Sequence, residues 1–416
     1  MDASMVRLAI ERKRDGATLD STTWEAIVAA YMDGTADDAQ MAALAMACVW
    51  RGLDLGEAVA LTRAMVASGA SLHYPHDVFV VDKHSSGGVS DIVSLVAVPL
   101  VAACGVKVAK LSGRALGHTG GTIDKLETIA GLRTTIEMDA FVRQVERVGC
   151  AIAAQSDAFV PADKRLYRLR DHTATVPSIG LIAASIVSKK VAGGAHAFVF
   201  DVKCGGAAFM RDVRQATDLA QTLVAVSHEF GRRARAVVSD MEEPLGRSIG
   251  TGIEVIEARE FLRGEDADGR VREGCLQIAV EMLALAGVRE PRETALGALQ
   301  SGKAYEKFVE MIEAQGGSRD ALERMSVTAR AHEVKASHAG FVTAIDAVAL
   351  GHAAREWSAH EPTGGIRVAM RVGARVERGD VIAVAYGAHA NAKRVADAFA
   401  IGAEAPPARP LAYATI

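Results

Sequence analysis

Residues 78–128 read VFVVDKHSSGGVSDIVSLVAVPLVAACGVKVAKLSGRALGHTGGTIDKLET, and this stretch decides the fold. A short β-rich run, Val78–Val81, leads into a Ser/Gly loop and then into an apolar helical run that ends at Gly105. A second strand, Val106–Leu111, is followed by a second loop, Ser112–Thr122, and by the start of another helix. Strand, glycine-rich loop and helix, twice in succession, present backbone N–H groups and helix N-termini to an anion. The stretch therefore predicts a phosphate site in an α/β domain.

Side chains in the same stretch offer further donors. Hydroxyl-bearing residues of the two loops and the first helix that add donors are Ser85, Ser86, Ser94, Ser112, Thr119 and Thr122. Lys83 and His84 follow the first strand. Because adjacent strand residues point to opposite sides, these two are predicted to do different jobs. Lys83 suits the anion, whereas His84 could reach an organic group; a solvated lysine and a structural histidine are the simpler alternative.

Composition narrows the class of protein. A chain of 416 residues, 50% hydrophobic but only 5% aromatic, is long enough for two or three domains of packed helices and sheet. The net charge of −4, with both signs interspersed, offers no basic surface for nucleic acid. Five singly placed cysteines indicate reduced thiols. No apolar stretch reaches the ~20 residues of a membrane span, so we expect a cytoplasmic protein.

The pattern of elements predicts an α/β fold, α+β overall. Residues 1–70 read as a small helical domain, in which Asp54 and Glu57 form a capping box. Residues 75–300 alternate strands and helices, which predicts a parallel or mixed sheet covered by helices. Residues 331–416 return to β-rich sequence and predict a C-terminal α+β domain.

A second group of candidate residues lies on a predicted helix, Ser178–Val191. Ser185 and Lys189 are four residues apart on this helix and share one face, and Arg170 lies in the turn region before it. Two cations and a hydroxyl match the carbonyls and ring N–H of a pyrimidine, and the cations would stabilise negative charge on a departing base. An amphipathic surface helix is an equal alternative on these residues alone. Lys190 is expected to be a solvated neighbour.

Three motifs make the chain resemble the thymidine/pyrimidine-nucleoside phosphorylase family. They are DKHSSGG at 82–88, SGRALGHTGGTIDKLE at 112–127 and RDHTATVPSI at 170–179, and the resemblance covers nearly the whole chain. It implies a pentosyltransferase that reversibly exchanges the base of uridine, thymidine or deoxyuridine for phosphate, giving α-(deoxy)ribose 1-phosphate. It also implies a homodimer, no required cofactor besides the co-substrate phosphate, no nucleic-acid or membrane partner, and a cleft between the helical domain, completed by residues 161–193, and the α/β domain.

The resemblance assigns roles residue by residue. The implied phosphate ligands are Lys83, Ser85, Ser94, Ser112 and Thr122. The implied catalytic residues are His84, Arg170 and Lys189, and the implied base ligands are Arg170, Ser185 and Lys189. Lys110 lies where thymidine-selective members typically carry Met, so it favours broad pyrimidine-nucleoside specificity over a strictly thymidine-selective enzyme.

Some pyrimidine-nucleoside members hold a potassium ion. The matching positions in this chain are Ser90, Ile92, Leu245, Ser248 and Glu257. Ser90 stands where glycine is usual in the family. The resemblance thus implies a cation site whose first loop is altered.

Two other functions stay open at this point. Anthranilate-type phosphoribosyltransferases share a related fold, and Asp240, Glu242 and Glu243 fall where those enzymes keep acidic magnesium ligands. A non-catalytic nucleotide- or phosphate-binding protein is the other alternative. Phosphorolysis without magnesium would separate the phosphorylase from the phosphoribosyltransferase.

Overall fold

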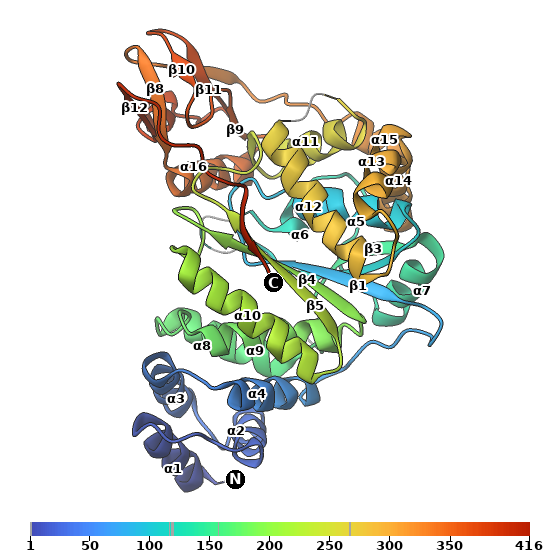
Figure 1. Cartoon of the computed structure of the whole chain (residues 1–416), viewed down its shortest axis with the longest axis vertical. Coiled ribbons are helices and arrows are strands. Elements are labelled where there is room, and N and C mark those ends of the chain that lie inside the picture. The colour runs from blue at the N-terminus through green and yellow to red at the C-terminus, as the bar shows by residue number, and fades with distance from the viewer. Residues whose placement is uncertain (1, 116, 118–119, 157, 266–267) are drawn as a thin grey trace.

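The structure, a computed structural model, describes residues 2–115, 117, 120–156, 158–265 and 268–416. Helices at the N-terminus, an α/β body and a β-rich C-terminal region follow one another along the longest axis of the molecule (Figure 1). The predicted α/β fold with a small helical region is therefore confirmed.

Helices near the start of the chain are joined by two from later in the sequence. The first four are α1 (Ala3–Arg14), α2 (Ser21–Asp33), α3 (Asp38–Arg51) and α4 (Leu55–Ala67). Asp54 and Glu57 form the predicted capping box at the start of α4. The later pair, α8 (Pro161–His172) and α9 (Ile179–Ala192), packs against α4. These contacts place α8 and α9 beside an N-terminal helix.

A six-stranded sheet forms the centre of the body, in the order β13-β5-β4-β1-β2-β3. Its strands are β1 (Val80–Ser85), β2 (Lys107–Ser112), β3 (Cys150–Ala154), β4 (Ala197–Cys204), β5 (Arg233–Asp240) and β13 (Ala412–Thr415). All neighbours are parallel except β13, which runs antiparallel to β5. β1 is longer than the predicted strand Val78–Val81, so Lys83 and His84 lie within it.

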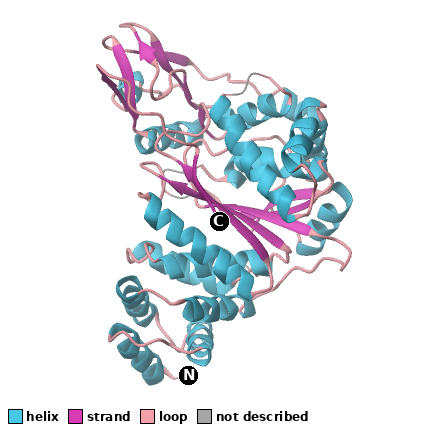
Figure 2. Cartoon of the chain, viewed as in Figure 1, coloured by secondary structure: helices cyan, strands magenta, loops and turns pink. Residues whose placement is uncertain are grey.

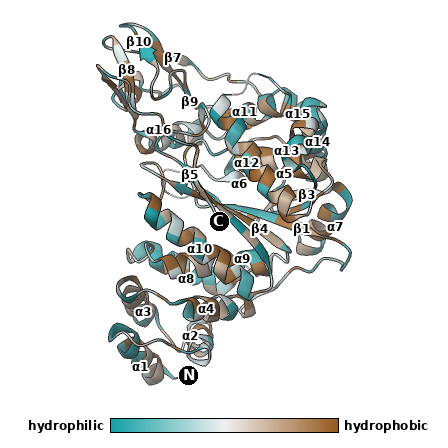
Figure 3. Ribbon diagram, viewed as in Figure 1, coloured by the Kyte–Doolittle hydropathy of each residue, from teal (hydrophilic) through white to brown (hydrophobic). Residues whose placement is uncertain are grey.

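Helices cover both faces of this sheet, and all of β4 is buried as a result. One face carries α7 (Met138–Val148), α9 and α10 (Val213–Glu229). The other carries α5 (Val93–Ala103) and α12 (Gly269–Leu285), with α14 (Lys303–Ala314) packed on α5. The remaining helices of the body are α6 (Thr122–Leu126), α11 (Gly252–Leu262), α13 (Pro291–Gln300) and α15 (Arg319–Glu323). Figure 3 shows that α5 is largely hydrophobic whereas α1 is largely hydrophilic.

The C-terminal region contains two antiparallel sheets, β10-β8-β12 and β6-β9-β11-β7 (Figure 2). Their elements are β6 (Ser248–Gly250), β7 (Ala331–Lys335), β8 (Gly340–Ile345), α16 (Ala347–His360), β9 (Gly365–Val368), β10 (Arg375–Val376), β11 (Val381–Tyr386), α17 (Ala392–Ala396) and β12 (Phe399–Gly402).

The body and the C-terminal region exchange strands. The body contributes β6 to the C-terminal sheet, where it pairs with β9, and the C-terminal segment contributes β13 to the central sheet. Among the described helices, none is long and apolar enough to cross a bilayer.

Candidate active site

A cavity of about 640 Å³ lies between the α8–α9 pair and the loops that follow β1 and β2. Ser85 and Ser112 line it from the α/β side, and Arg170 and Lys189 line it from α8 and α9. The structure therefore brings together the two groups of residues that the sequence placed on separate elements.

Hydroxyl groups and glycines form the α/β wall of this cavity. Ser85, Ser94, Ser112 and Thr122 all line it, Ser94 from the first turn of α5 and Thr122 from the first residue of α6. The Ser85 hydroxyl donates to Asp91 Oδ2 at 2.6 Å. Of the hydroxyl residues named from the sequence, Thr119 lies outside the described residues. Donors gathered in this way are suited to an oxyanion.

Lys83 lies behind this wall and is fully buried. Its Nζ is 3.4 Å from Ser94 Oγ, 3.3 Å from Asp201 Oδ2 and 3.9 Å from Asp91 Oδ2. Lys203 pairs with the same Asp201 at 2.7 Å. Burial alone would raise the pKa of Asp91, but Lys203 and Lys83 hold it below its ordinary value. Lys83 is therefore not a lining residue of the cavity, but it contacts Ser94, which does line it.

Sequence reasoning missed Asp91, Asp201 and Lys203. A signal was present in β4, where Asp201 and Lys203 interrupt the otherwise apolar run AFVFDVKC. Charged residues in a strand buried on both faces need opposite charges nearby, because an isolated buried charge is very costly. The pattern could have indicated the charge network, although not its partners.

His84 and Lys83 point to opposite faces of the sheet, as predicted. Lys83 meets α5, whereas His84 lines the cavity on the side of α9. Desolvation lowers the pKa of His84 well below its ordinary value, and Lys190 and Lys110 lower it further. The imidazole is therefore neutral near pH 7 and offers one N–H donor and one acceptor.

Lys110 lines the same cavity and is almost fully buried. Its Nζ is 3.4 Å from the backbone carbonyl of Leu111. Burial lowers the pKa of Lys110 well below its ordinary value, and Lys190 adds to that effect. A bound dianion in the cavity would favour the charged form of this lysine.

The helical wall carries the three candidate base ligands. Lys189 Nζ lies 3.1 Å from Ser185 Oγ and 2.6 Å from Asp163 Oδ2, so the shared face predicted for Ser185 and Lys189 is present. Arg170 is almost fully buried and donates to the carbonyls of Thr175, Leu181 and Val176 at 3.2, 3.1 and 2.7 Å. Arg170 thus fixes the turn between α8 and α9 while it lines the cavity.

The expectation of a solvated Lys190 was wrong. Its side chain is buried and donates to Asp82 Oδ2 at 2.6 Å and to the carbonyl of Leu111 at 3.2 Å. Consecutive helix residues are about 100° apart around the axis, so Lys190 faces the sheet when Lys189 faces the cavity. Asp82 on β1 supplies the opposite charge that burial of Lys190 requires.

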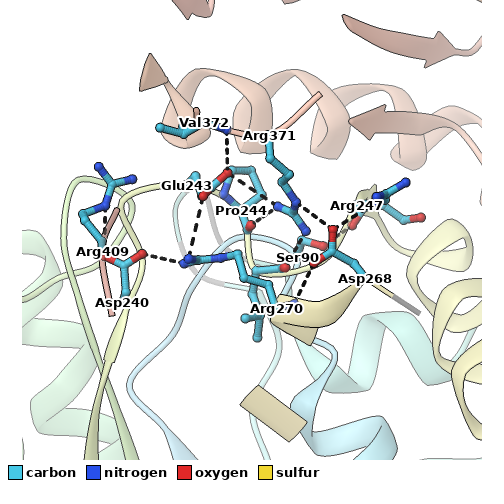
Figure 4. Close-up of polar contacts among 12 residues, drawn as sticks. Ser90, Asp240, Glu243, Pro244, Arg247, Asp268, Arg270, Arg371, Val372 and Arg409 are labelled. Carbon is cyan, nitrogen blue, oxygen red and sulfur yellow. Dashed lines mark hydrogen bonds and ion pairs between the residues drawn. The ribbon is translucent and has the colours of Figure 1, made fainter. Parts of the chain in front are cut away.

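The carboxylates considered as magnesium ligands have other partners. Asp240 accepts a hydrogen bond from Arg270 (Figure 4). It accepts another from Tyr413 at 2.6 Å. Glu243 lies 3.7 Å from Arg270 and 3.8 Å from Arg371. Glu242 accepts a hydrogen bond from the N–H of Gly206, and Glu243 accepts one from the N–H of Val372. Among the described residues, no three His, Cys, Asp or Glu side chains are grouped to hold a metal ion.

The positions implied for potassium are close to one another. The Ser90 hydroxyl donates to the carbonyl of Ser248, and the carboxylate of Glu257 accepts from the N–H of Ser248 at 2.6 Å. Leu245 donates its N–H to the carbonyl of Val89 in the first loop. The Ser248 carbonyl and the Glu257 carboxylate therefore already accept hydrogen bonds from the protein.

Two regions of the chain match a family of glycosyl transferases. Residues 77–305 match the glycosyl transferase family a/b domain, and residues 7–69 match its helical bundle domain. The structure is also similar to anthranilate phosphoribosyltransferase from Thermus thermophilus, with a TM-score of 0.59 and 20% identity over 74% of this chain and 99% of that one. That likeness establishes a shared fold.

Curated relatives give a finer assignment. Thymidine phosphorylase from Mycobacterium tuberculosis is 45% identical over 89% of this chain and 85% of its own length. Pyrimidine-nucleoside phosphorylase from Geobacillus stearothermophilus is 42% identical over 91% of this chain and 90% of its own. The chain therefore belongs to the glycosyl transferase family, within its group of thymidine and pyrimidine-nucleoside phosphorylases.

Proposed function

We propose that this chain catalyses the reversible phosphorolysis of pyrimidine nucleosides, with uridine, thymidine and deoxyuridine as substrates. The observation that carries the proposal is the shared cavity in which the Ser/Thr wall faces Arg170, Ser185 and Lys189. Phosphate on one wall and a pyrimidine on the other would place the glycosidic bond between them.

In this mechanism a phosphate oxygen attacks C1′ from the face opposite the base. The C1′–N bond breaks through an oxocarbenium-like state, and its electron pair passes to the pyrimidine ring. Lys189 and Arg170 stabilise the negative charge that develops on the ring carbonyls. Exclusion of water from the closed cleft prevents hydrolysis of the sugar.

His84 acts in this proposal as a neutral hydrogen-bond donor to the pyrimidine O2. Its lowered pKa favours donation of an N–H over transfer of a full proton. Ser85, Ser94, Ser112 and Thr122 hold the phosphate, and Lys83 supports them through Ser94. The final proton on the base comes from solvent after release.

The direct test measures base release from uridine, thymidine, deoxyuridine and cytidine, with and without phosphate and without magnesium. We expect release of uracil and thymine that depends strictly on phosphate, with matching formation of pentose 1-phosphate. Base release that does not depend on phosphate would contradict the proposal. So would an activity that requires magnesium and a pyrophosphorylated ribose.

Lys110 supports broad specificity within this reaction. An ammonium in the cavity wall can contact the phosphate or the hydroxyl side of the sugar, so uridine should be accepted beside thymidine. The ratio of kcat/KM for the two nucleosides checks this. A preference for thymidine above about a hundredfold would instead indicate a thymidine-selective enzyme.

We also propose a homodimer formed through the N-terminal helices. Large apolar side chains exposed on or beside α1 and α3 are Met5, Leu8, Met46, Trp50 and Leu55. Trp50 is 81% exposed, and Met46 lies one helical turn before it on the same face. Contiguous exposed apolar side chains of this size are typical of protein–protein contacts.

A further inference from the structure

The potassium positions implied by the family meet where the body joins the C-terminal region. The first loop contributes Ser90, the segment before β6 contributes Leu245, β6 begins at Ser248, and α11 contributes Glu257. Arg371, which precedes β10, reaches into the same junction (Figure 4). A carbonyl oxygen has two lone pairs, so the placement of the donors that it already binds decides whether a cation can approach as well.

Each of the five implied ligands accepts at least one hydrogen bond from the protein. The carbonyl of Ser90 accepts from Gly246 N–H at 3.1 Å, and that of Ile92 accepts from the first N–H groups of α5. The carboxylate of Glu257 accepts two N–H groups, from Arg247 at 2.9 Å and from Ser248 at 2.6 Å.

The remaining two ligands are engaged by side chains. Ser248 accepts the Ser90 hydroxyl through its carbonyl oxygen. The carbonyl of Leu245 accepts from Arg371 Nη2 at 2.8 Å. Both donors are side-chain groups that this chain supplies itself.

The backbone of Ser90 shows how its side chain is placed. Its φ of 56° lies in the left-handed region, which side chains disfavour and glycine accepts readily. The residue is nevertheless buried, and its hydroxyl lies against Gly246, where an added Cβ would clash with it. The same Cβ position is 3.1 Å from both carboxylate oxygens of Glu257. The hydroxyl group therefore contacts the Ser248 carbonyl and lies against Gly246.

Arg371 brings a permanent positive charge to this junction. Besides Leu245, its guanidinium donates to the carbonyl of Pro244 and pairs with Asp268 at 3.1 Å. Arginine stays protonated at all physiological pH values, so this charge is present without any dissolved ion. This charge is paired with Asp268 and with Glu243, which lies 3.8 Å away. What Ser90 and Arg371 supply to the implied ligands is therefore hydrogen-bond donors, to the carbonyls of Ser248 and Leu245.

We propose that the Ser90 hydroxyl and the Arg371 guanidinium take the place of a monovalent cation at this junction. The residues implied for potassium therefore do not fit the ion in this chain. The body and the C-terminal region are held together here by groups of the protein itself, and potassium has no specific role in folding or activity.

Thermal unfolding in chloride salts of equal ionic strength tests the proposal. The Tm of the parent protein in potassium chloride should match its Tm in tetramethylammonium chloride within about 1 °C, because an ion that binds only the folded state would raise it. Initial rates of phosphorolysis should match as well. A rise in Tm of more than about 3 °C that is specific to potassium would overturn the proposal.

Removal of both groups should restore a response to the ion. A Ser90→Gly, Arg371→Met double variant should have a lower Tm than the parent, and potassium but not tetramethylammonium should raise it. Arg247→Met is the matched control, since its side chain pairs with Asp268 at 3.1 Å but donates to none of the five ligands. If the double variant folds and its Tm does not depend on potassium, these oxygens form no cation site even without the two side chains. That result would also contradict the proposal that Ser90 and Arg371 take the place of a cation.

Discussion

His84 shows how burial sets the chemistry of a single residue. The positive charges of Lys190, Lys110, Lys189 and Lys83 act on its imidazole, so the charged form is disfavoured both by desolvation and by repulsion. A general acid would need the opposite environment. The residue is better suited to orient the base through one N–H than to deliver a proton to it.

The ionisation of His84 can be followed by NMR in the unliganded protein. The ring resonance that is lost in His84→Asn should keep its neutral chemical shift as the pH falls to its ordinary pKa of 6.5 and below. Because the folded pKa is depressed, the neutral ring contributes stability that is complete above 6.5 and is lost as the pH falls below it. A midpoint at or above 6.5 would contradict the assignment.

The buried pair of Asp82 and Lys190 predicts a second effect at this scale. Lys190→Met should lower the free energy of unfolding by about 3–5 kcal/mol, because Asp82 would remain charged and unpaired. The double change with Asp82→Asn should recover much of that loss. Urea unfolding measures both.

Lys393→Met serves as the surface control for this pair. Lys393 is 81% exposed in its side chain and pairs with Asp397 at 2.7 Å, so its loss should cost no more than about 1 kcal/mol. If Lys190→Met behaved like this control, the Asp82–Lys190 pair would not be buried in solution.

At the scale of elements, α16 contacts the loop between β2 and α6 through a hydrogen bond. Arg355 on α16 donates to the carbonyl of Gly117 at 2.6 Å, and Gly117 lines the candidate phosphate cavity together with Gly113 and Gly120. A helix of the C-terminal region thus touches a loop that the sequence places at the anion. This contact couples the two regions at the site.

Loss of this contact should weaken phosphate binding more than turnover. Arg355→Ala should raise the KM for phosphate about fivefold, the equivalent of about 1 kcal/mol for one hydrogen bond, with kcat and the KM for nucleoside nearly unchanged. Arg355→Lys should recover part of the affinity. Steady-state kinetics at varied phosphate provide the measurement.

Arg394→Ala is the matched control for this element. Arg394 lies in the same region and pairs with Glu356 of α16 at 2.7 Å, without a hydrogen bond or ion pair to the described residues of the loop. An equal rise in the KM for phosphate in both variants would show that the effect is a general weakening of the C-terminal region.

Part of the candidate site could be predicted from local patterns in the sequence. The i,i+4 spacing of Ser185 and Lys189 is encoded within a few residues, and the two side chains are 3.1 Å apart in the structure. The pairing of Lys190 with Asp82 depends on which helix covers which strand 108 residues away. No periodicity within α9 reveals that partner, and the lysine looked solvated for that reason.

At the scale of the whole molecule, the exposed apolar surface of the N-terminal helices predicts an assembly. Trp50→Glu should shift the mass measured by light scattering from that of two chains toward that of one, because a charge replaces the most exposed large hydrophobic side chain in this surface. Val213→Glu is the control, since Val213 is also exposed but begins α10. A parent protein with the mass of one chain would refute the dimer.

The division into domains was harder to predict than the elements. Residues 331–416 read as a separate β-rich region, yet β13 completes the central sheet and Tyr413 bonds to Asp240, 173 residues earlier. A four-residue strand has too few positions for an alternating pattern to reveal its partner. The limits of the three domains remain a prediction.

The mutual exchange of β6 and β13 has a consequence for protein engineering. Two chains of this group could not trade their last regions through one recombination point in the connecting segment, since each hybrid would inherit a strand shaped for the sheet of the other parent. A workable chimera would carry residues 248–250 and 412–415 with the sheets that they complete. The units that can be exchanged between relatives are therefore complete sheets, and these are not continuous segments of the chain.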